Sequence, residues 1–263
     1  MKAISSEANS AFRRWLRVAT MPRAARAFGQ TLAEGIHLAQ AAIDSAIAVD
    51  AVLVRRGTRH PQIEALLERL PSSATRYELA PALYDRLAPV EQGVGLLLVL
   101  PVPECALPQR AAIDMLYLDG VQDPGNVGAL IRTAAAAGVG RVLAATGTAW
   151  LWSPKALRAG MGAHFRIGLH ERVAATQLPS TLDGQWIVAL AHDAPSLWEQ
   201  DLPRCALGWI FGAEGTGPSS AALAASHTRV RIPMAGGVES LNVAAAAAVC
   251  LFERLRRKQA LDL

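Results

Sequence analysis

The sequence predicts an α/β protein of two units, and two observations carry this prediction. Strand-like runs alternate with helical patterns along most of the chain, which is typical of a parallel sheet with helices on both faces. The stretch from Pro101 to Pro108 is too rich in proline to continue a helix or a strand. We therefore expect a smaller α/β unit over residues 1–107 and a larger one, with the parallel sheet, over residues 108–263.

Hydrophobic periodicity places the individual elements. In the first unit, helices are expected near Gly29 to Ala42 and over Pro61 to Leu70, and strands over Ala51 to Val54 and Gly95 to Leu100. In the second unit, strands are expected over Met115 to Leu118, Arg141 to Ala145, Trp186 to Ala191, Gly208 to Phe211 and Thr228 to Ile232. Helices are expected there over Val127 to Ala137, Pro154 to Met161, Ser219 to Ala225 and Leu241 to Arg257.

The length and composition agree with a folded protein of this kind. A chain of 263 residues suits one large or two modest domains, and 52% hydrophobic with 18% charged residues excludes a disordered chain. The longest unbroken apolar run, Val243 to Phe252, has about half of the roughly 20 residues that span a bilayer. The 3 cysteines lie far apart and form neither a disulfide framework nor a metal-ligand pattern. We expect a cytoplasmic protein with no membrane partner and no metal.

A run of arginines lies near the amino end, where no acid occurs between Glu7 and Glu34. Its members are Arg13, Arg14, Arg17, Arg23 and Arg26. Such a run can hold phosphates. Two other interpretations stay open: a solvated helix face, and an arginine-rich transit peptide. Against the second, the run leads without a cleavage-like break into the patterned stretch Thr31 to Leu38.

Ligands of open parallel sheets bind beyond the carboxyl ends of the strands, and the first such end here runs from Asp119 to Arg132. A strand ends in a Gly/Pro turn, and we expect Asn126 to cap the following helix and Gly138 to close it. Capping does not account for Arg132, a fixed cation in an otherwise apolar helix with no acid in its next two turns. A buried arginine at this place needs an anionic partner, and none is local.

Two further strand ends lead into glycine-containing loops. The loop from Ile210 to Pro218 has three glycines, which let backbone amides approach a ligand closely, although a plain turn also explains them. Their spacing is not G-x-G-x-x-G, so a conventional dinucleotide site is disfavoured. The loop from Ile232 to Asn242 reaches Ser240, which we expect to cap the last helix. The cations at that helix's carboxyl end suit its dipole and favour a structural role: Arg254, Arg256, Arg257 and Lys258.

Taken in order, the three segments resemble the signature motifs of the SpoU/TrmH family of RNA ribose 2'-O-methyltransferases, within the SPOUT class. The pieces that carry the resemblance are Asn126-Val-Gly-x-x-x-Arg132, Gly212-x-Glu-Gly-x-Gly217, Ile232-Pro-Met234 and Ser240-Leu-Asn-Val-Ala244. Ser153-Pro-Lys and Arg158 to Ala163 also look like family sequence. Some members have Asn where this chain has Ala213, and others have Ala, so the difference bears on the subfamily. More loosely, Phe28 to His37 resembles the family's substrate-binding domain of the ribosomal L30e/L7Ae kind.

The resemblance implies a SPOUT domain with a trefoil knot, preceded by an L30e/L7Ae-like RNA substrate-binding domain over residues 1–107. It implies S-adenosylmethionine as the cofactor, held mainly by backbone groups of Gly212, Gly215, Ile232, Met234, Ser240 and Leu241. Arg132 would stabilise the 2'-oxygen as it loses its proton, while Asn126, Glu214, Ser240 and Asn242 would orient the ribose, Arg132 and the loops. The arginine run would then bind RNA, and the protein would be a homodimer.

The substrate and two competing functions stay open at this point. The additional amino-terminal domain favours ribosomal RNA over transfer RNA as the methyl acceptor. A non-catalytic RNA-binding protein would have no reason to retain Arg132 and Asn242 in their motif positions. An α/β dehydrogenase fits the alternation of elements, but the chain lacks the glycine fingerprint and a suitably spaced acid.

Overall fold

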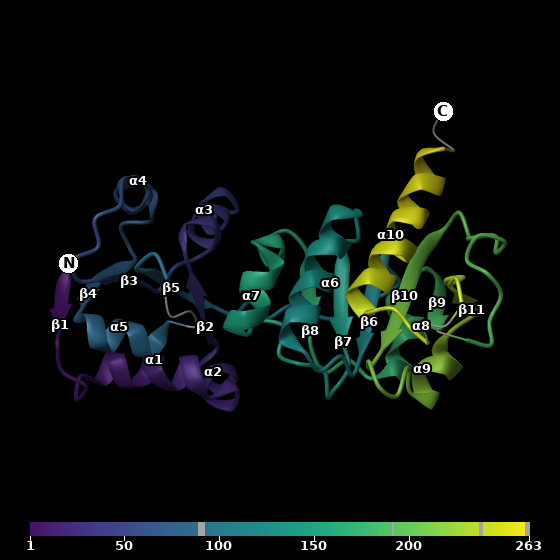
Figure 1. Cartoon of the computed structure of the whole chain (residues 1–263), viewed down its shortest axis with the longest axis horizontal. Helices are drawn as coiled ribbons and strands as arrows, with labels where there is room; N and C mark the ends of the chain where they lie inside the picture. The colour runs from purple at the N-terminus through teal and green to yellow at the C-terminus, as the bar shows by residue number, and fades with distance from the viewer. Residues whose placement is uncertain (89–92, 191, 237–238, 261–263) are drawn as a thin grey trace. The chain divides into compact units, whose positions relative to one another are not determined.

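The structure, a computed structural model, describes residues 1–88, 93–190, 192–236 and 239–260, and the chain divides into two compact units (Figure 1). The first unit comprises Met1–Glu104 together with Trp152–Phe165, and the second comprises Cys105–Leu151 together with Arg166–Leu263. The segment Trp152–Phe165 therefore packs with the first unit although the sequence placed it in the second. A functional domain boundary at residue 107 stays a prediction.

The first unit contains a mixed five-stranded sheet of order β1-β4-β3-β5-β2, in which β5 is antiparallel to β2 and β3. Its strands are β1 (Lys2–Ile4), β2 (Gln30–Glu34), β3 (Ala51–Arg55), β4 (Thr75–Leu79) and β5 (Leu96–Pro101). Its helices are α1 (Ser10–Thr20), α2 (Pro22–Phe28), α3 (Ile36–Asp44), α4 (Pro61–Arg69), α5 (Pro81–Leu87) and α7 (Pro154–Gly160), and η1 (Ala163–Phe165) is a 3₁₀ turn.

One expected element of this unit is wrong, because the helix predicted from Gly29 begins only at Ile36. Gln30–Glu34 forms β2 instead and pairs with β5. Leu32 and Ala33 are fully buried, as a strand covered on both faces requires. The short apolar stretch carried no periodicity that separates a strand from a helix, and the pairing with β5 decided between them.

The arginine run lies on two helices that the periodicity did not predict. The side-chain oxygen of Asn9 caps α1 by accepting from Ala11 N and Phe12 N. Three side chains of α1 face the core at helical spacing: Phe12, Trp15 and Val18. All five arginines of the run are exposed. The spacing of Phe12, Trp15 and Val18 is itself a helical signal in the sequence, and the predictions above did not use it.

The second unit contains a six-stranded sheet of order β11-β9-β10-β6-β7-β8, and every pairing in it is parallel. Its strands are β6 (Met115–Asp119), β7 (Arg141–Ala144), β8 (Gly168–His170), β9 (Gly184–Leu190), β10 (Ala206–Gly212) and β11 (Thr228–Arg231). Its helices are α6 (Pro124–Ala136), α8 (Leu178–Thr181), α9 (Ser220–Ala225) and α10 (Val243–Gln259), with a 3₁₀ turn η2 (Ala175–Gln177). The predicted parallel α/β sheet is thereby confirmed.

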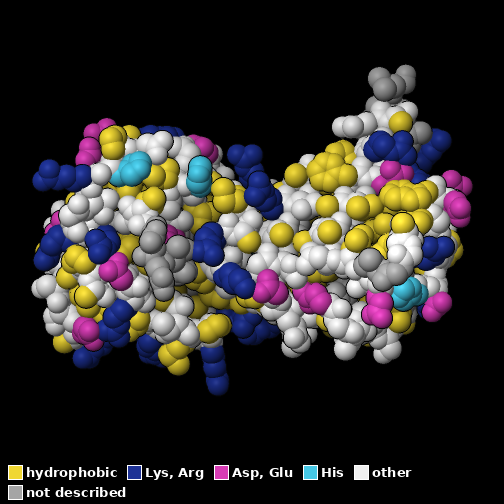
Figure 2. Space-filling view, viewed as in Figure 1, with side chains coloured by type: hydrophobic (Ala, Val, Ile, Leu, Met, Phe, Trp, Pro, Cys, Tyr) yellow, Lys and Arg dark blue, Asp and Glu magenta, His cyan; other side chains and the backbone are white. Residues whose placement is uncertain are grey.

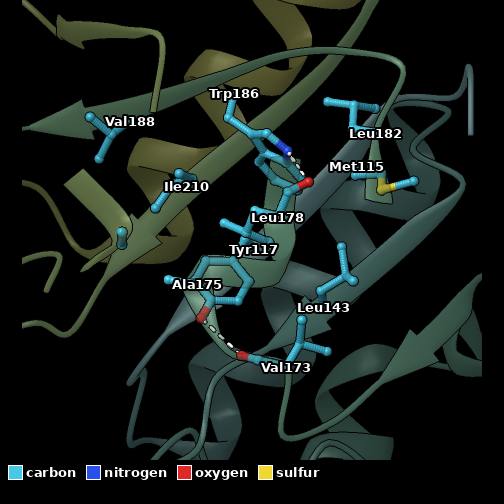
Figure 3. Close-up of a cluster of buried hydrophobic side chains, with 11 residues drawn as sticks. Met115, Tyr117, Leu143, Val173, Ala175, Leu178, Leu182, Trp186, Val188 and Ile210 are labelled. Carbon is cyan, nitrogen blue, oxygen red and sulfur yellow. Dashed lines mark hydrogen bonds between the residues drawn. The ribbon is translucent and has the colours of Figure 1, made fainter. Parts of the chain in front are cut away.

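Alternation along the strands gives the sheet two apolar faces. Met115, Tyr117, Trp186 and Ile210 point to one face and meet Leu178, as Figure 3 shows. The polar atoms of this cluster are paired, because the Tyr117 hydroxyl donates to the Val173 carbonyl at 3.0 Å and Trp186 Nε1 donates to the Leu178 carbonyl at 2.9 Å. The cluster thus buries aromatic residues without leaving their polar atoms unpaired.

Helices α6 and α10 pack side by side over the sheet (Figure 1). The cations at the carboxyl end of α10 form ion pairs within the protein, which agrees with the structural role predicted for them. Arg254 and Lys258 pair with Asp114, and Arg257 pairs with Glu253. In the part of the chain that the structure describes, no helix has the length and apolar character needed to cross a membrane, and no cluster of His, Cys, Asp and Glu fits a metal.

Candidate functional site

A chain of hydrogen bonds joins the three motif segments at the carboxyl ends of β6 and β10. Asn126 Nδ2 donates to Glu214 Oε1 at 2.7 Å, and Asn242 Nδ2 donates to Asn126 Oδ1 at 3.1 Å. These residues are far apart in the sequence and come from α6, the loop after β10 and the start of α10. Since ligands of parallel sheets bind beyond this edge, the three side chains mark the candidate site.

Asn126 is free to make these bonds because it does not cap α6, contrary to our expectation. The cap is Asp123, whose carboxylate accepts from the Asn126 backbone N–H at 2.9 Å, and Pro124 occupies the first turn. Asn126 therefore lies in the first turn of the helix with its amide pointing to Glu214. Gly138 follows the last turn with φ of 77°, as expected for a helix that closes in the left-handed region.

The start of α10 also differs from the prediction, because Asn242 and not Ser240 caps it. Asn242 Oδ1 accepts from Ala244 N at 2.9 Å and from Ala245 N at 3.4 Å, while Nδ2 of the same amide binds Asn126. One side chain thus starts α10 and connects it to α6. Ser240 is exposed in the preceding loop.

The loop after β10 folds back tightly on Gly212. A Cβ on Gly212 would lie 2.1 Å from Pro218 N and 2.2 Å from the carbonyl carbon of Gly217. The loop closes with Gly217 N donating to the Ala213 carbonyl at 2.9 Å, and the Asp119 carboxylate accepts from Ser219 N at 2.6 Å. Gly212 is therefore required by the loop's own backbone, whereas a Cβ on Gly215 would meet nothing within 4 Å, so open space lies beside that residue.

Arg132 lies on α6 about 9 Å along the axis from Asn126, given a rise of about 1.5 Å per residue. It is exposed, so the expectation of a buried cation with an anionic partner is wrong. Among the described residues, no hydrogen bond or ion pair holds its guanidinium. The group is thus available to a ligand at the protein surface.

The remaining predicted cofactor residues follow β11 in the loop before α10. Ile232 and Met234 are half-buried, and Leu241 is 40% exposed. Gly237 and Val238 of this loop lie outside the described residues. The structure brings Asn126, Glu214 and Asn242 together, and within the described ranges no hydrogen bond joins Ser240 or Arg132 to them.

Three residues that shape the site were not predicted. Asp119 binds the loop after β10, and Asp123 caps the start of α6. Thr148 accepts a hydrogen bond from Gly120 N at 3.1 Å and donates one to the Leu118 carbonyl at 2.9 Å. An aspartate directly before a proline is a helix-start signal that could have identified Asp123. Thr148 carries no such local signal because its partners are about thirty residues away.

Two arginines of the run are held against an aromatic ring. The guanidinium carbons of Arg14 and Arg17 lie 4.9 and 5.1 Å from the centre of the Phe28 ring, and Arg14 Nε donates to Gln30 Oε1 at 2.9 Å. Neither forms an ion pair with a described carboxylate. Figure 2 shows Lys and Arg side chains along the edge of the first unit where Figure 1 places α1 and α2. The two exposed guanidinium groups are thus held in place beside Phe28.

Comparison with known proteins identifies the family. A model described as the SpoU rRNA Methylase family matches residues 115–252. The 23S rRNA (guanosine(2553)-2'-O)-methyltransferase RlmP of Bacillus subtilis is 33% identical over 260 residues, with 96% of this chain and 98% of that protein covered. The chain belongs to the SpoU rRNA methylase family. The family match runs from β6 into α10 and so contains all three hydrogen-bonded residues of the site.

Solved structures of methyltransferases share the fold. A crystal structure of an RNA 2'-O ribose methyltransferase is 27% identical with a TM-score of 0.81, covering 98% of this chain and 99% of that one. The SpoU methyltransferase AviRb from Streptomyces viridochromogenes, crystallised with AdoMet, is 22% identical with a TM-score of 0.87, covering 96% of this chain and 99% of that one. Both likenesses extend over the first unit as well as the family domain.

Proposed function

We propose that this protein transfers a methyl group from S-adenosylmethionine to a ribose 2'-hydroxyl of ribosomal RNA. The observation that carries the proposal is the hydrogen-bonded chain Glu214–Asn126–Asn242, which unites the three family motifs at the carboxyl edge of the sheet. The relatives support the substrate, because RlmP of Bacillus subtilis is named as a 23S rRNA guanosine 2'-O-methyltransferase and aligns over nearly the whole chain.

The loops after β10 and β11 fit the cofactor. S-adenosylmethionine supplies an electrophilic methyl group when it is bound. Gly215 leaves space beside its backbone, and the half-buried Ile232 and Met234 with the exposed Leu241 offer apolar surface next to the polar Ser240. Gly212 contributes to this site indirectly, because its lack of a side chain lets the loop after β10 fold back on itself. Backbone amides of these loops would hold the cofactor, which explains why no dinucleotide fingerprint is needed.

Arg132 is the residue that we assign to the reacting hydroxyl. Its guanidinium would stabilise the negative charge that develops on the 2'-oxygen while the proton of the hydroxyl passes to solvent water. The oxygen then bonds to the methyl carbon as the bond between that carbon and the cofactor's sulfur breaks, leaving the sulfur as a neutral thioether. Arg132 does not accept the proton, because a guanidinium remains charged at any ordinary pH. The hydrogen bond between Asn126 and Glu214 connects the first turn of α6 to the loop after β10. It thereby helps to fix the position of Arg132, which lies on the same helix. Asn242 fixes the start of α10 and the loop that precedes it.

Three further features belong to the same proposal. The chain would form a trefoil knot, which is supported by α10 returning from the edge strand β11 to pack on α6. The first unit would be an L30e/L7Ae-like RNA-binding domain that uses the arginine run. The protein would act as a cytoplasmic homodimer through the second unit, where hydrophobic side chains gather over α6 and α10 (Figure 2) and Leu241 and Phe252 are 40% and 46% exposed.

The test is an Arg132→Ala variant, compared with Arg204→Ala as a control at another exposed arginine of the second unit. We expect Arg132→Ala to lower the single-turnover rate of methyl transfer about 100- to 1000-fold, the cost of removing one preorganised stabiliser of developing charge. Binding of S-adenosylmethionine, measured by calorimetry, should stay unchanged. Wild-type rates in Arg132→Ala would remove Arg132 from the mechanism.

The acceptor is tested with the unmodified enzyme. Ribosomal and transfer RNA lacking ribose methylation are each incubated with labelled S-adenosylmethionine, and the methylated positions are mapped. We expect transfer to ribosomal RNA. Transfer to tRNA alone would replace the substrate, and no transfer to either RNA would overturn the proposed function.

A further inference from the structure

A hollow of about 400 Å³ lies in the first unit between α1 and the edge of the sheet where β2, β3 and β4 begin. A volume of this size is within the range of small-molecule sites. All residues that line it belong to the described part of the chain, and those used below are Arg14, Trp15, Gln30, Asp50 and Tyr77. Arg14 is also a member of the arginine run, so the hollow adjoins that run.

A hydrogen-bonded carboxamide holds a cation and an anion apart in this hollow. Arg14 Nε donates to Gln30 Oε1 at 2.9 Å, and Gln30 Nε2 donates to one carboxylate oxygen of Asp50. Gln30 is only 9% exposed and uses both ends of its amide in these bonds, so its position is fixed. Among the described residues, neither Arg14 nor Asp50 forms an ion pair. The two opposite charges therefore stay available to a ligand.

Both charged side chains are exposed and keep unused hydrogen-bonding capacity. The Arg14 guanidinium lies over the Phe28 ring, 4.9 Å from its centre, and has N–H donors beyond the one that binds Gln30. One oxygen of Asp50 accepts from Gln30, and no described residue donates to the other. A guanidinium only donates and a carboxylate only accepts. The hollow thus suits a ligand that carries an anionic group at one place and N–H donors at another.

Aromatic side chains form a wall of the hollow beside these charges. The rings of Trp15 and Tyr77 meet edge to face, with their centres 4.9 Å apart. Trp15 is 5% exposed and supports Tyr77 from the core side, while the half-buried Tyr77 leaves part of its side chain uncovered. An aromatic ring that is held in place and partly uncovered provides a surface on which a nucleobase can stack.

We propose that this hollow binds one unpaired guanosine of the RNA substrate, with the base at Asp50 and a phosphate at Arg14. Guanine fits a carboxylate because its N1–H and its N2 amino group are adjacent donors on the edge that is free in an unpaired base. The other three bases place an acceptor beside their donor, which a carboxylate would repel. The inference rests on the proposed function, which makes RNA the ligand, and it concerns a nucleotide other than the methyl acceptor.

Asp50→Asn is the decisive variant, because two interpretations of Asp50 predict changes of opposite sign. The asparagine keeps the size of the side chain and an oxygen for Gln30, but it loses the charge and one acceptor. If Asp50 binds guanine, affinity for RNA that contains an unpaired guanosine falls. If Asp50 is only an acid at the surface, it repels phosphates, and its neutralisation strengthens the binding of every RNA. The matched control is Glu68→Gln, at an exposed acid of α4 outside the hollow.

The probes are short oligouridine strands that carry one central guanosine, inosine or adenosine, and fluorescence anisotropy with the full chain gives their affinities. We expect the wild-type protein to bind the guanosine strand about 10-fold more tightly than the adenosine strand, the effect of hydrogen bonds to a charged group. Inosine lacks the N2 amino group, so its strand should fall between the two. Asp50→Asn should lose the preference, and Glu68→Gln should keep it. Arg14→Ala should reduce the slope of log affinity against log salt by about one for all strands.

Three results would overturn the proposal. The first is equal affinity of the wild-type protein for the guanosine and adenosine strands, a comparison that needs no substitution and so does not depend on how a variant folds. The second is a preference for guanosine that survives in Asp50→Asn, or a salt slope that is unchanged in Arg14→Ala. The third is tighter binding of guanosine monophosphate than of the guanosine strand, which would assign the hollow to a free nucleotide.

Failure of this proposal is distinguishable from failure of the proposed function. Methyl transfer to ribosomal RNA is measured separately, with the wild-type enzyme. Transfer without any preference for guanosine would overturn the hollow and leave the methyltransferase function standing. Absence of transfer to any RNA would overturn the function, whatever the oligouridine strands show.

Discussion

Asp114 and Glu34 are two carboxylates in the two units, and their buried oxygens meet opposite surroundings. Asp114, just before β6, accepts hydrogen bonds from Arg254, from Lys258 at 3.1 Å and from Leu207 N at 2.9 Å. Glu34, at the end of β2, has two buried oxygens for which the described residues offer no hydrogen bond. Burial is common to both, and the supply of donors is what differs.

The pKa values of the two groups shift in opposite directions as a result. Burial is the largest influence on Asp114 and raises its pKa, but the hydrogen bonds and charge of Arg254, together with Leu207 N and Lys258, outweigh it and lower the pKa overall. Burial raises the pKa of Glu34 to about 7, and the charge of Arg158 opposes this only in part. A buried carboxylate thus stabilises the fold only where hydrogen-bond donors surround it, as they surround Asp114 in the second unit.

The largest expected effect comes from breaking the Asp114 cluster. Arg254 donates to both oxygens of Asp114 and also to the Cys205 carbonyl at 2.6 Å, and its side chain is 6% exposed. We expect Arg254→Ala to lower the free energy of unfolding by about 3 kcal/mol, because the buried Asp114 carboxylate then keeps only Lys258, whose side chain is 47% exposed, and Leu207 N as partners. Urea unfolding measures this. The control Arg256→Ala, at an arginine 67% exposed on the same helix, should cost much less stability, because an exposed ion pair contributes little. Equal losses of stability in the two variants would show that the buried contact between Arg254 and Asp114 contributes no more than an exposed ion pair.

The pH dependence of Glu34 gives the next largest effect. Its folded pKa of about 7 exceeds the ordinary 4.5, so the folded state holds more protons between these values and stability falls as pH rises through this window. After allowance for solvent screening of a half-buried group, the fall is on the order of 1 kcal/mol. Glu34→Gln should flatten this part of the profile in thermal unfolding from pH 4 to 8. An unchanged slope would contradict the shift. Asp114 contributes in the opposite sense, with stability present above pH 3.8 and lost as pH falls below it.

The smallest expected effect on stability concerns two buried tyrosine hydroxyls, of which one has a hydrogen-bond partner and the other has none among the described residues. The Tyr117 hydroxyl donates to the Val173 carbonyl, whereas the Tyr84 hydroxyl lacks a described partner. We expect Tyr117→Phe to lower the free energy of unfolding by about 1 kcal/mol and Tyr84→Phe to leave it unchanged or raise it. Chemical denaturation of both variants provides the measurement. A loss in Tyr84→Phe that equals the loss in Tyr117→Phe would mean that the protein itself satisfies the Tyr84 hydroxyl.

The sequence by itself determined the parallel sheet of the second unit and the segments that form its site. Strands such as Met115–Asp119 and Ala206–Gly212 are short apolar runs bounded by turns, and that pattern is local. The segments that hold Asn126, Glu214 and Asn242 were singled out because each follows the end of a strand, and the resemblance to the SpoU/TrmH family then assigned roles to the three residues. The cationic end of α10 was likewise assigned a structural role from its position alone.

Only the tertiary structure decided what these residues contact. Gln30–Glu34 is a strand because β5 pairs with it, and Gly212 must be glycine because its own loop returns to it. Asn126 binds Glu214, and Asn242 binds Asn126, although 88 and 116 residues separate the partners along the chain. Hydrophobic periodicity acts over a few residues, so it can be detected in the sequence, whereas the choice between neighbouring candidate caps, such as Asp123 and Asn126, was decided only in the structure. Hydrogen bonds between distant segments depend on how the whole chain folds, so a local sequence pattern does not indicate them.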